Sequence, residues 1–481
     1  MAPTFVKAGT ATLLVVLAAI LLQRRSEHQL KERLQTVLNS LLRAEHKVHV
    51  SSTEPRRVAV GLGSCLDSVT TAVQLFDRIS VQPPAGEDVK HHDSLRSARE
   101  LAEGFTYFFT RGAAAERYVH DKLLFKRLVA AARDMPEAKW TIGGNAPVMA
   151  NRMAREGCQV LLGSVISDTI AKEIETGVKV TSHSTDQEVE EVHMILEYKT
   201  GETWGSFSAP RANRFIVHSD ASNPLLSSLE SFQEQLKPFK PHAVVIGGLQ
   251  MMDNFPFKGD VRSQRLGLLR NVLTRDVPTD IPIHFEFASF VEQATALDVI
   301  NHVVLYADSL GMNEQELPNL YSLLNYGNIS VVSDPYPRVA TVLDQMRSVY
   351  RSLRTVRGPS MRALTRLHVH TLAFQAILTT KNSKWKNTMA AAAKASLTAY
   401  RHVCGSDHIE VAKAHLIMDD SFSLSRQEGS DRVLFQNHRP VSCWEEEDYQ
   451  ICLAPVLVCT QVRKTAGGGD NISAAALAAQ I

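Results

Sequence analysis

The sequence predicts an α/β protein whose mostly parallel sheet is covered by helices on both faces. From Arg57 onward, short apolar runs alternate with longer segments whose apolar residues recur at helical spacing, and this alternation is typical of βαβ units. The 481 residues are 44% hydrophobic and include 25 glycines and 19 prolines. This composition excludes collagen-like, low-complexity and wholly disordered chains.

The apolar runs predict the strands and the segments between them predict the helices. The predicted strands are Val58–Leu62, Val160–Leu162, Ala243–Ile246, Ile283–Phe287, Val303–Tyr306 and Val456–Cys459. Helical periodicity is clear at Ala146–Glu156 and at Ser263–Thr274. The polar stretch from Gln427 to Tyr449 is predicted to be a solvated loop.

The stretch from Asp186 to His218 has a different pattern. Val192–Tyr198 and Arg214–His218 are predicted strands, with a turn at Gly201-Glu202 and no full helix between them. We therefore expect a smaller, β-rich α/β piece inserted into the α/β body.

The N-terminal fifty residues are predicted to be a targeting leader. Ala8–Leu22 carries no charge and as a helix would span about 22 Å, less than the ~30 Å core of a bilayer. That length suits a signal peptide or a marginal signal-anchor, so we expect the secretory pathway, with the protein anchored or lumenal in the endoplasmic reticulum or secreted. The flanking Arg24 and Arg25 instead favour a cytosolic C-terminal side.

A second helix is predicted over Gln23–His46, where leucines recur at helical spacing. It is either a spacer helix that packs on the following domain or an interfacial membrane helix. The turn-rich Ser51–Pro55 is the expected boundary, so residues 1–50 form the leader and residues 51–481 the main domain.

Charge and cysteine content exclude two further classes of protein. Lys and Arg number 52 against 51 Asp and Glu, and this balance argues against a dedicated nucleic-acid binder. Six cysteines without a CxxC pair give no support to a structural zinc site. Cys65, Cys158 and Cys459 lie beside predicted strands and are candidate buried thiols, while disulfide pairing stays open.

The strongest chemical motif lies near the C-terminus, after the strand Val456–Cys459. Gly467, Gly468 and Gly469 precede Asp470 and a run of small residues, a pattern that predicts a loop opening a helix. The free N–H groups of such a terminus bind anions, and an adjacent carboxylate can accept a proton from an attacking hydroxyl. The alternative is a flexible turn in which Asp470 caps the helix.

Two further motifs are suited to sugar hydroxyls. Gly143, Gly144 and Asn145 enter the helix Ala146–Glu156, where glycines let the backbone approach a ligand and the Asn amide both donates and accepts. Asp67 follows the first strand and can hold vicinal hydroxyls. Helix capping is the alternative for Asn145 and Asp67 alike.

Two glutamates are candidate magnesium ligands. Glu286 lies in an apolar strand, where an unpaired carboxylate is costly and calls for a partner or a cation. Glu316 follows a later strand in Asn313–Glu316. Together they could hold Mg²⁺ through water molecules, although Glu316 alone suits the exposed start of a helix.

In this order, the motifs resemble the ADP-dependent sugar kinases of the ribokinase-like superfamily, and specifically the animal glucokinases. The resemblance runs from about Arg57 to the end of the chain. Further stretches that carry it are Arg111–Glu116 (RGAAAE), Ile195–Tyr198 with Gly201-Glu202, Ala212–Ile216 (ANRFI), Gly248–Met252 (GLQMM), Asn313–Glu316 (NEQE) and Thr365–Leu372 (TRLHVHTL).

The resemblance implies a ribokinase-like Rossmann-type body and a smaller lid formed by discontinuous segments roughly within residues 67–220. The implied reaction is ADP + D-glucose → AMP + D-glucose 6-phosphate, with one Mg²⁺ held partly through water by Glu286, Glu316 and Asp470. The implied roles are general base for Asp470, anion hole for Gly467, Gly468 and Gly469, sugar binding for Asp67, Gly143, Gly144, Asn145 and Glu197, and nucleotide binding for Arg214 and His370. The expected partners are ADP, AMP and glucose, with no nucleic acid, membrane contact only through the N-terminal segment, and a monomeric state.

The sequence departs from the family pattern in two places, and in the second of them the extra Gly468 also loosens the loop. Gly63 stands where the family usually has Asn, and Lys464 begins a Lys-Thr-Ala-Gly-Gly-Gly-Asp motif in which the family has Arg-Thr-Val-Gly-x-Gly-Asp. Replacing Arg by Lys removes a bidentate fork. The alternatives are therefore a related sugar kinase with another donor or acceptor, and a non-catalytic pseudokinase that binds sugar or nucleotide.

Overall fold

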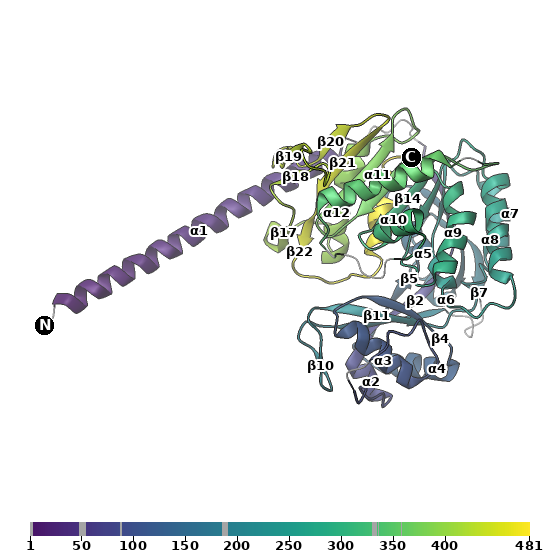
Figure 1. Cartoon of the computed structure of the whole chain (residues 1–481), viewed down its shortest axis with the longest axis horizontal. Helices are drawn as coiled ribbons and strands as arrows, with labels where there is room; N and C mark the ends of the chain where they lie inside the picture. The colour runs from purple at the N-terminus through teal and green to yellow at the C-terminus, as the bar shows by residue number, and fades with distance from the viewer. Residues whose placement is uncertain are drawn as a thin grey trace.

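The computed structural model describes residues 3–47, 54–86, 89–184, 191–329, 334, 336–356 and 358–481, with side chains from residue 19 onward except at residue 184. This part of the chain forms a ten-stranded sheet, a six-stranded sheet and smaller two-stranded sheets. In Figure 1 the six-stranded sheet and its helices lie below the larger body, and α1 (Pro3–Glu45) projects from the body as one long helix.

The ten-stranded sheet has the order β20-β21-β16-β15-β14-β13-β12-β1-β6-β7. Its strands from β15 to β7 pair in parallel, and β16, β21 and β20 pair antiparallel. The parallel strands are β1 (Arg57–Gly61), β6 (Gln159–Ser167), β7 (Val178–Ser184), β12 (Ala243–Ile246), β13 (Ile283–Glu286), β14 (Ser309–Asn313) and β15 (Arg366–His370). The antiparallel strands are β16 (Phe374–Thr380), β20 (Ser442–Glu445) and β21 (Tyr449–Pro455).

Helices cover both faces of this sheet. One apolar core contains residues of α7 (Leu229–Phe239), α8 (Val261–Asn271), α9 (Gln293–His302), α10 (Glu316–Tyr326) and α11 (Val339–Thr355). The opposite face is covered by α5 (Asn145–Arg155), α12 (Thr388–Cys404) and α13 (Gly468–Ala478). Along β1, Ala59 packs in the core on one face of the sheet, and Val58 and Val60 pack in the core on the other. This is expected because successive side chains of a strand point to opposite faces. The predicted α/β class and Rossmann-type body are confirmed.

The six-stranded sheet, hereafter the lid sheet, has the order β3-β4-β11-β8-β2-β5. Its strands are β2 (Cys65–Thr71), β3 (Ser94–Leu95), β4 (Ala115–Val119), β5 (Lys139–Gly143), β8 (Val192–Tyr198) and β11 (Asn213–His218). Its helices α2 (Ala72–Arg78), α3 (Ala98–Phe109) and α4 (Lys122–Arg133) pack on one face over an aromatic core that includes Phe76, Phe105 and Phe215. The other face of the lid sheet points to the body. A small hairpin of β9 (Thr203–Trp204) and β10 (Phe207–Ser208) joins β8 to β11.

The segments that connect the body to the lid sheet are held together by hydrogen bonds and by the close packing of glycine backbones. Ser64, before β2, donates its N–H to Oδ1 of Asn223 at 3.1 Å, and Asn223, after β11, donates back to the Ser64 carbonyl at 2.8 Å. Gly144, after β5, has φ +79°, and a Cβ there would lie 2.7 Å from the Gly63 carbonyl oxygen. Three connections therefore meet at one point beside the carboxyl edge of the body sheet.

The C-terminal half of α1 packs on the body, as predicted for a spacer helix. Leu34, Val37 and Leu41 are buried in the core that contains α12, and the Glu45 carboxylate pairs with Arg401 at 2.7 Å. The targeting segment Ala8–Leu22 lies in the same helix, but its side chains up to Ala18 are outside the described residues. Among the described residues, we find no helix with the length and hydropathy needed to cross a bilayer.

Three predictions of local structure are wrong. Val303–Tyr306 is not a strand, because Val304–Tyr306 forms a short 3-10 turn that packs its apolar residues under the sheet. The stretch from Gln427 to Tyr449 contains β19 (Arg432–Leu434) and β20. Cys459 is not a thiol, because it is bonded to Cys404; a second disulfide joins Cys443 to Cys452, while Cys65 and Cys158 are the buried free thiols predicted.

Glu446, assigned to a solvated loop by the sequence, instead joins β20 to α11. Arg347 donates to its carboxylate from Nε at 2.9 Å and from Nη2 at 2.6 Å, and Trp444 donates from Nε1 at 2.9 Å. Partial burial opposes ionisation, but the hydrogen bonds from Arg347, Tyr449 and Trp444 outweigh it and lower the pKa of Glu446 to about 2.

We predict that Glu446→Gln destabilises the protein in a pH-dependent way. Because the folded pKa lies below the unfolded one, the stabilisation is complete above about pH 4.5 and is lost as the pH falls toward 2. Urea unfolding should show the variant less stable than the parent at pH 7 and the difference narrowing at pH 3. Glu447→Gln, at an exposed neighbour, is the control, and a gap that stays constant with pH would contradict the assignment.

Candidate active site

A polar pocket of about 190 Å³ lies between the carboxyl edge of the body sheet and the lid sheet. Such an edge is where ligands bind in open α/β sheets. The residues that line it are Cys65, Asp67, Glu116, Gly143, Gly144, Asn145, Val148, His193, Ile195, Arg214, Ile216, Gln250, Met251, Ala466, Gly467 and Asp470.

Asp470 lies in the first turn of α13, where the pocket meets the helix N-terminus. Gly467 has φ +68° and precedes the helix, which begins at Gly468. The side chain of Asn145 donates to Oδ1 of Asp470 at 2.7 Å. Burial, together with repulsion from Glu286, raises the pKa of Asp470 to about 7. The glycine segment therefore opens a helix, as predicted, and the carboxylate beside it is poised to gain or lose a proton near neutral pH.

Gly143, Gly144 and Asn145 form the turn from β5 into α5. A Cβ on Gly143 would lie 2.1 Å from Oδ1 of Asp67, so glycine is required at this position. Asn145 accepts a hydrogen bond from Nε2 of Gln250 at 3.0 Å. Oε1 of Gln250 is buried without a hydrogen-bond partner in the described structure. The turn and Gln250 thus present a fixed set of polar groups, in which Oε1 of Gln250 is an unpaired acceptor.

Asp67 lies within the lid strand β2 rather than after the first strand of the body. It is opposite Thr141 of β5 and His193 of β8, and the Cys65 thiol donates to its Oδ1 at 3.3 Å. Burial raises the pKa of Asp67 to about 6, against the opposing effect of His193. The sequence placed Asp67 in the right pocket but on the wrong sheet, because β2 follows β1 after only three residues.

Glu286 is a buried carboxylate at the end of β13. Its oxygens lie 2.9 Å from Nε2 of His284 and 3.4 Å from Nε2 of His370. Burial opposes ionisation, but these imidazoles outweigh it and lower the pKa of Glu286 to about 2. The sequence expectation that this carboxylate needs a partner is met by two histidines.

Glu316 is buried at the start of α10, and not at an exposed helix terminus. The Asn313 backbone N–H donates to its Oε2 at 2.7 Å, and the Asn313 amide donates to Oε1 at 2.9 Å. Burial, with repulsion from Glu286, Glu314 and Asp470, raises the pKa of Glu316 well above its usual range.

These carboxylates suit Mg²⁺ by their chemistry. The donor set is all oxygen, as Mg²⁺ prefers, and the mutual repulsion of Glu286, Glu316 and Asp470 is the kind that a cation relieves. Within the described residues, their ligand atoms are not among the groups that converge within 4.8 Å of one another. Coordination of Mg²⁺ by these three carboxylates, partly through water, stays a prediction.

Of the remaining predicted residues, Arg214 and His370 lie near the site and Glu197 lies away from it. Arg214 lines the pocket from β11, opposite Glu197 of β8. His370 packs under Gly469, where a Cβ would lie 2.7 Å from its Cε1. Glu197 is on the same face of the lid sheet as His193 and Ile195 but is exposed and does not line the pocket. It lies four residues farther along β8 than His193, and its sugar contact stays a prediction.

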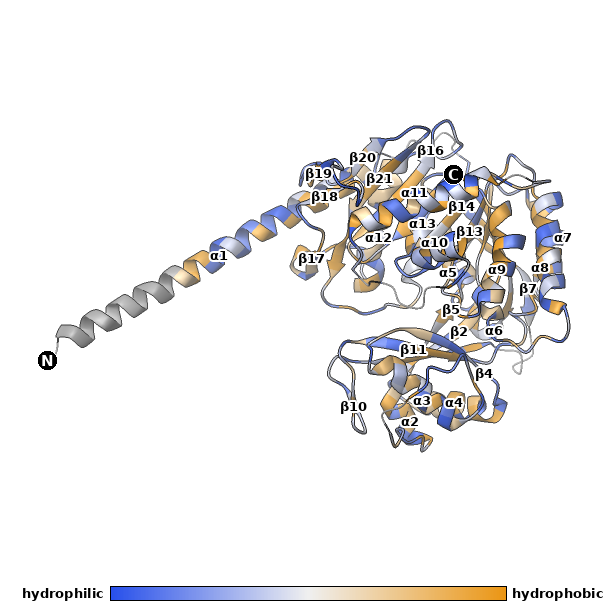
Figure 2. Ribbon diagram, in the orientation of Figure 1, coloured by the Kyte–Doolittle hydropathy of each residue, from blue (hydrophilic) through white to orange (hydrophobic). Residues whose placement is uncertain are grey.

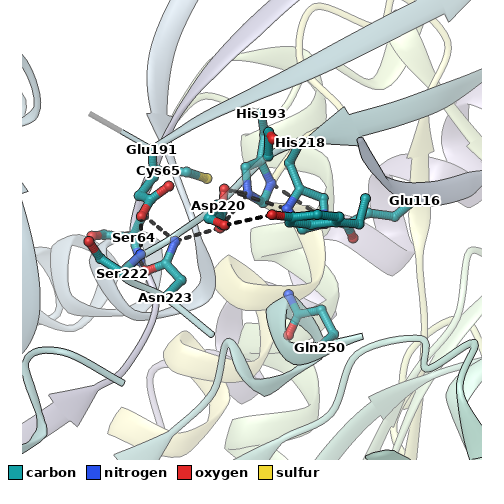
Figure 3. A network of polar contacts seen from close by, with 12 residues as sticks. Ser64, Cys65, Glu116, Glu191, His193, His218, Asp220, Ser222, Asn223 and Gln250 are labelled. Atoms are coloured by element: carbon teal, nitrogen blue, oxygen red, sulfur yellow. Dashed lines mark hydrogen bonds and ion pairs between the residues drawn. The ribbon is translucent and has the colours of Figure 1, made fainter. Parts of the chain in front are cut away.

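Several residues of the pocket were missed by sequence reasoning (Figure 3). Glu116, His193 and Gln250 line the pocket, and Asp220 lies behind His193, 3.1 Å from its Nε2. A period of two along β8, which places His193 on the face of Ile195 and Glu197, could have identified the histidine. Asp220 follows β11, and no local sequence pattern marks it as a site residue.

A family model described as the ADP-specific phosphofructokinase/glucokinase conserved region matches residues 56–479. The chain belongs to this family. Among the curated proteins, it is 36% identical to the ADP-dependent glucokinase of Bos taurus over 88% of this chain and 84% of the relative. It is 30% identical to the probable ADP-dependent glucokinase of Caenorhabditis elegans over the same shares.

Solved structures of the family share the fold. An ADP-dependent kinase in complex with fructose 6-phosphate and ADPβS has a TM-score of 0.64 at 17% identity, over 93% of this chain and 97% of the other. A phosphofructokinase ancestor reconstructed for the Methanosarcinales has a TM-score of 0.59 at 18% identity, over 94% and 98%. These two structures show that the fold is shared, and the family resemblance seen in the sequence is confirmed by the family model and the two curated relatives.

The structure gives a local reason for one departure from the family pattern. Gly63 has φ +74°, and a Cβ there would lie 3.1 Å from Cα of Gly248. Gly248 in turn has φ +80° and would place a Cβ 2.6 Å from the Leu62 carbonyl oxygen. The two backbones pack closely on each other, so any side chain at position 63 is crowded against Gly248 and Met251. Lys464, the other departure, donates to Thr141 of β5 at 3.3 Å.

Proposed function

We propose that this protein transfers the β-phosphoryl group of ADP to D-glucose and releases AMP and D-glucose 6-phosphate. The observation that carries the proposal is the position of Asp470, which lies both in the first turn of α13 and in the wall of the polar pocket. A base for the sugar hydroxyl and an anion-binding helix terminus for the phosphoryl group thus face the same space. The names of the relatives support ADP as the donor and glucose as the acceptor.

The pocket residues bind and orient the sugar. The Asp67 carboxylate accepts hydrogen bonds from sugar hydroxyl groups, and the Asn145 amide can both donate to and accept from them. The unpartnered Oε1 of Gln250 is a further acceptor. Asn145 also fixes the Asp470 carboxylate through its 2.7 Å hydrogen bond. One hydroxyl is thereby directed at Asp470, which takes its proton as the oxygen attacks phosphorus.

The N–H of Gly469 and the dipole of α13 stabilise the negative charge of the transferred group. The Gly468 N–H donates to the Thr465 carbonyl at 3.3 Å and closes the loop that precedes the helix. His370 lies against Gly469 and Glu286 and supports this loop from below. Closure of the lid sheet over the body would exclude water and limit wasteful hydrolysis of ADP.

A second cavity, at the same edge of the body sheet, is available for the nucleotide. A cavity of about 650 Å³ is lined by the N-terminus of α11, by Ala373 and Phe374 at the start of β16, and by residues of 417–432. This volume is in the range of small-molecule sites. We propose that the adenosine moiety lies there, beyond His370.

The proposed Mg²⁺ would be held by Glu286, Glu316 and Asp470, partly through water, and would supply charge neutralisation for the phosphates. We predict that Glu286→Gln raises the half-saturating Mg²⁺ concentration by about 10- to 100-fold, because one fixed negative charge of the site is removed. Activity measured across a Mg²⁺ series checks this. Glu234→Gln, at an exposed position, should leave the Mg²⁺ dependence unchanged; an unaltered dependence in Glu286→Gln would rule out its role.

A donor-by-acceptor screen tests the proposed reaction. ADP and ATP are each supplied with glucose and with fructose 6-phosphate, and AMP and the sugar product are measured. We expect product with ADP and glucose only. Product from fructose 6-phosphate or from ATP would identify a related sugar kinase, and binding of ADP and glucose without product would identify a pseudokinase.

We propose that the leader directs the protein to the secretory pathway, anchored or lumenal in the endoplasmic reticulum or secreted, and that the protein is monomeric. The uncharged Ala8–Leu22 supports the first proposal. Cell fractionation with protease protection, and light scattering of the purified chain, test the two proposals separately.

A further inference from the structure

A cluster of thiol, imidazole and carboxylate groups lies in the wall of the sugar pocket (Figure 3). The ligand atoms of Cys65, Asp67 and His193 lie within 4.8 Å of one another, and all three residues are buried. Neighbouring lid strands position them, since β2 carries Cys65 and Asp67 and β8 carries His193, directly opposite Asp67. The cluster is rigid because both strands are paired on each side within the lid sheet.

His193 is oriented by a carboxylate behind it. Nε2 of His193 lies 3.1 Å from both oxygens of Asp220. Asp220 is itself fixed by a hydrogen bond from the Asn223 amide at 2.7 Å. With Nε2 engaged by Asp220, Nδ1 is available to a ligand, and Oε1 of Glu116 lies 3.4 Å from it. A carboxylate that holds one imidazole nitrogen while the other faces a ligand is the usual support of a metal-binding histidine.

The charges of this region favour a cation. Asp67, Glu116 and Asp220 gather around His193 and His218, and in the described part of the chain the side-chain ion pairs of these carboxylates are with imidazoles alone. Three carboxylates and the Cys65 thiol face two imidazoles here, and the other nearby cations are Arg214 in the pocket wall and Lys464 beside Asp67. The pocket of about 190 Å³ beside them leaves room for an ion and one further ligand.

We propose that Cys65, Asp67 and His193 bind a soft divalent cation of the Zn²⁺ class, and that this ion competes with the sugar. A sulfur, nitrogen and oxygen donor set suits Zn²⁺ and excludes Mg²⁺, which prefers oxygen alone. The Cys65 thiol loses its proton and His193 binds as the neutral imidazole, so binding releases protons and is weaker at low pH. The site is separate from the carboxylates Glu286 and Glu316. Metal binding itself does not depend on the proposed sugar kinase activity, but the competition does.

Metal titration of the full chain with its disulfides intact tests the proposal. Zn²⁺ affinity is measured against a chromophoric chelator, and Co²⁺ is added as a spectroscopic probe of thiolate ligation. We expect about one equivalent of Zn²⁺ per chain and a thiolate-to-cobalt charge-transfer band in the near ultraviolet. Cys65→Ser should lose the band and bind Zn²⁺ at least about 100-fold more weakly, whereas Cys158→Ser, which removes the other buried free thiol, should keep both. Asp220→Asn should keep the band and weaken Zn²⁺ binding by about 10- to 100-fold.

The parent protein alone can overturn the proposal, so a variant that fails to fold leaves it testable. A Co²⁺ complex without a thiolate band, or equal Zn²⁺ affinity in Cys65→Ser and Cys158→Ser, would refute the site. Glucose should raise the apparent dissociation constant for Zn²⁺. If Zn²⁺ binds through Cys65 but glucose has no effect, the metal site stands and the proposed sugar pocket is wrong.

Discussion

Replacing Asp470 by Asn is expected to lower kcat by about 10²- to 10⁴-fold and to leave the KM values for ADP and glucose within a few-fold. Asn has the size of Asp and can still accept the hydrogen bond from Asn145, so the turn at the start of α13 keeps its shape. The change removes the group that takes the hydroxyl proton. Formation of AMP and glucose 6-phosphate, measured separately, gives both constants.

The outcome distinguishes a base from a structural cap. If Asp470 only caps α13, the variant would lose thermal stability and keep its turnover. Asp134→Asn, at an exposed position directly after α4 and outside both cavities, is the matched control and should behave as the parent does. Turnover within a few-fold of the parent in Asp470→Asn would exclude the general-base role.

Replacing Gly143 by Ala is expected to raise the KM for glucose by more than about 100-fold, or to abolish sugar binding. The added Cβ would lie 2.1 Å from Oδ1 and 2.3 Å from Cγ of Asp67, closer than real atoms approach. The backbone of Asp67 is held between β5 and β8, so the side chain has to turn away and its carboxylate leaves its position in the pocket. A glucose titration at saturating ADP measures the effect.

Gly267→Ala is the control for the Gly143 variant. Gly267 lies in α8 with nothing within 4 Å of its added Cβ, and Ala favours a helix over Gly by about 1 kcal/mol. This control should keep its KM and gain stability. A glucose KM in Gly143→Ala equal to that of the control would show that Asp67 does not contact the sugar.

The parts of the fold that follow local rules could be predicted from the sequence. The apolar runs at Val58 and Ala243 and the helix ending before Gly157 are local signals, and the structure contains the corresponding elements. The run at Val303 has the same composition but forms a 3-10 turn, since its place in the core is set by α9 and β14, which no local pattern reports.

The sequence identified the site residues that lie beside a glycine-containing turn. Asp470 and Asn145 follow glycines that a turn requires, so the sequence identifies them. Glu116 and Asp220 could not be found in this way, because what gives them a role is the pairing of β4 with β11 and the return of the chain after β11. Alternation along β8 places Glu197 and His193 on the same face of the strand. It does not show that His193 lies nearer to the body, so the sequence alone could not identify His193 as the residue that lines the pocket.

The interleaved path of the chain limits how the lid sheet can be exchanged between relatives. Two neighbouring interior strands, β2 and β8, pair from Leu66–Val192 to Thr71–Glu197, yet they come from stretches separated by the body strands β6 and β7. A graft of either stretch alone would set a foreign strand against a native one along its whole length. Chimeras that seek a new sugar preference therefore need both stretches from one donor, together with the residues around Ser64 and Asn223 that tie them to the body.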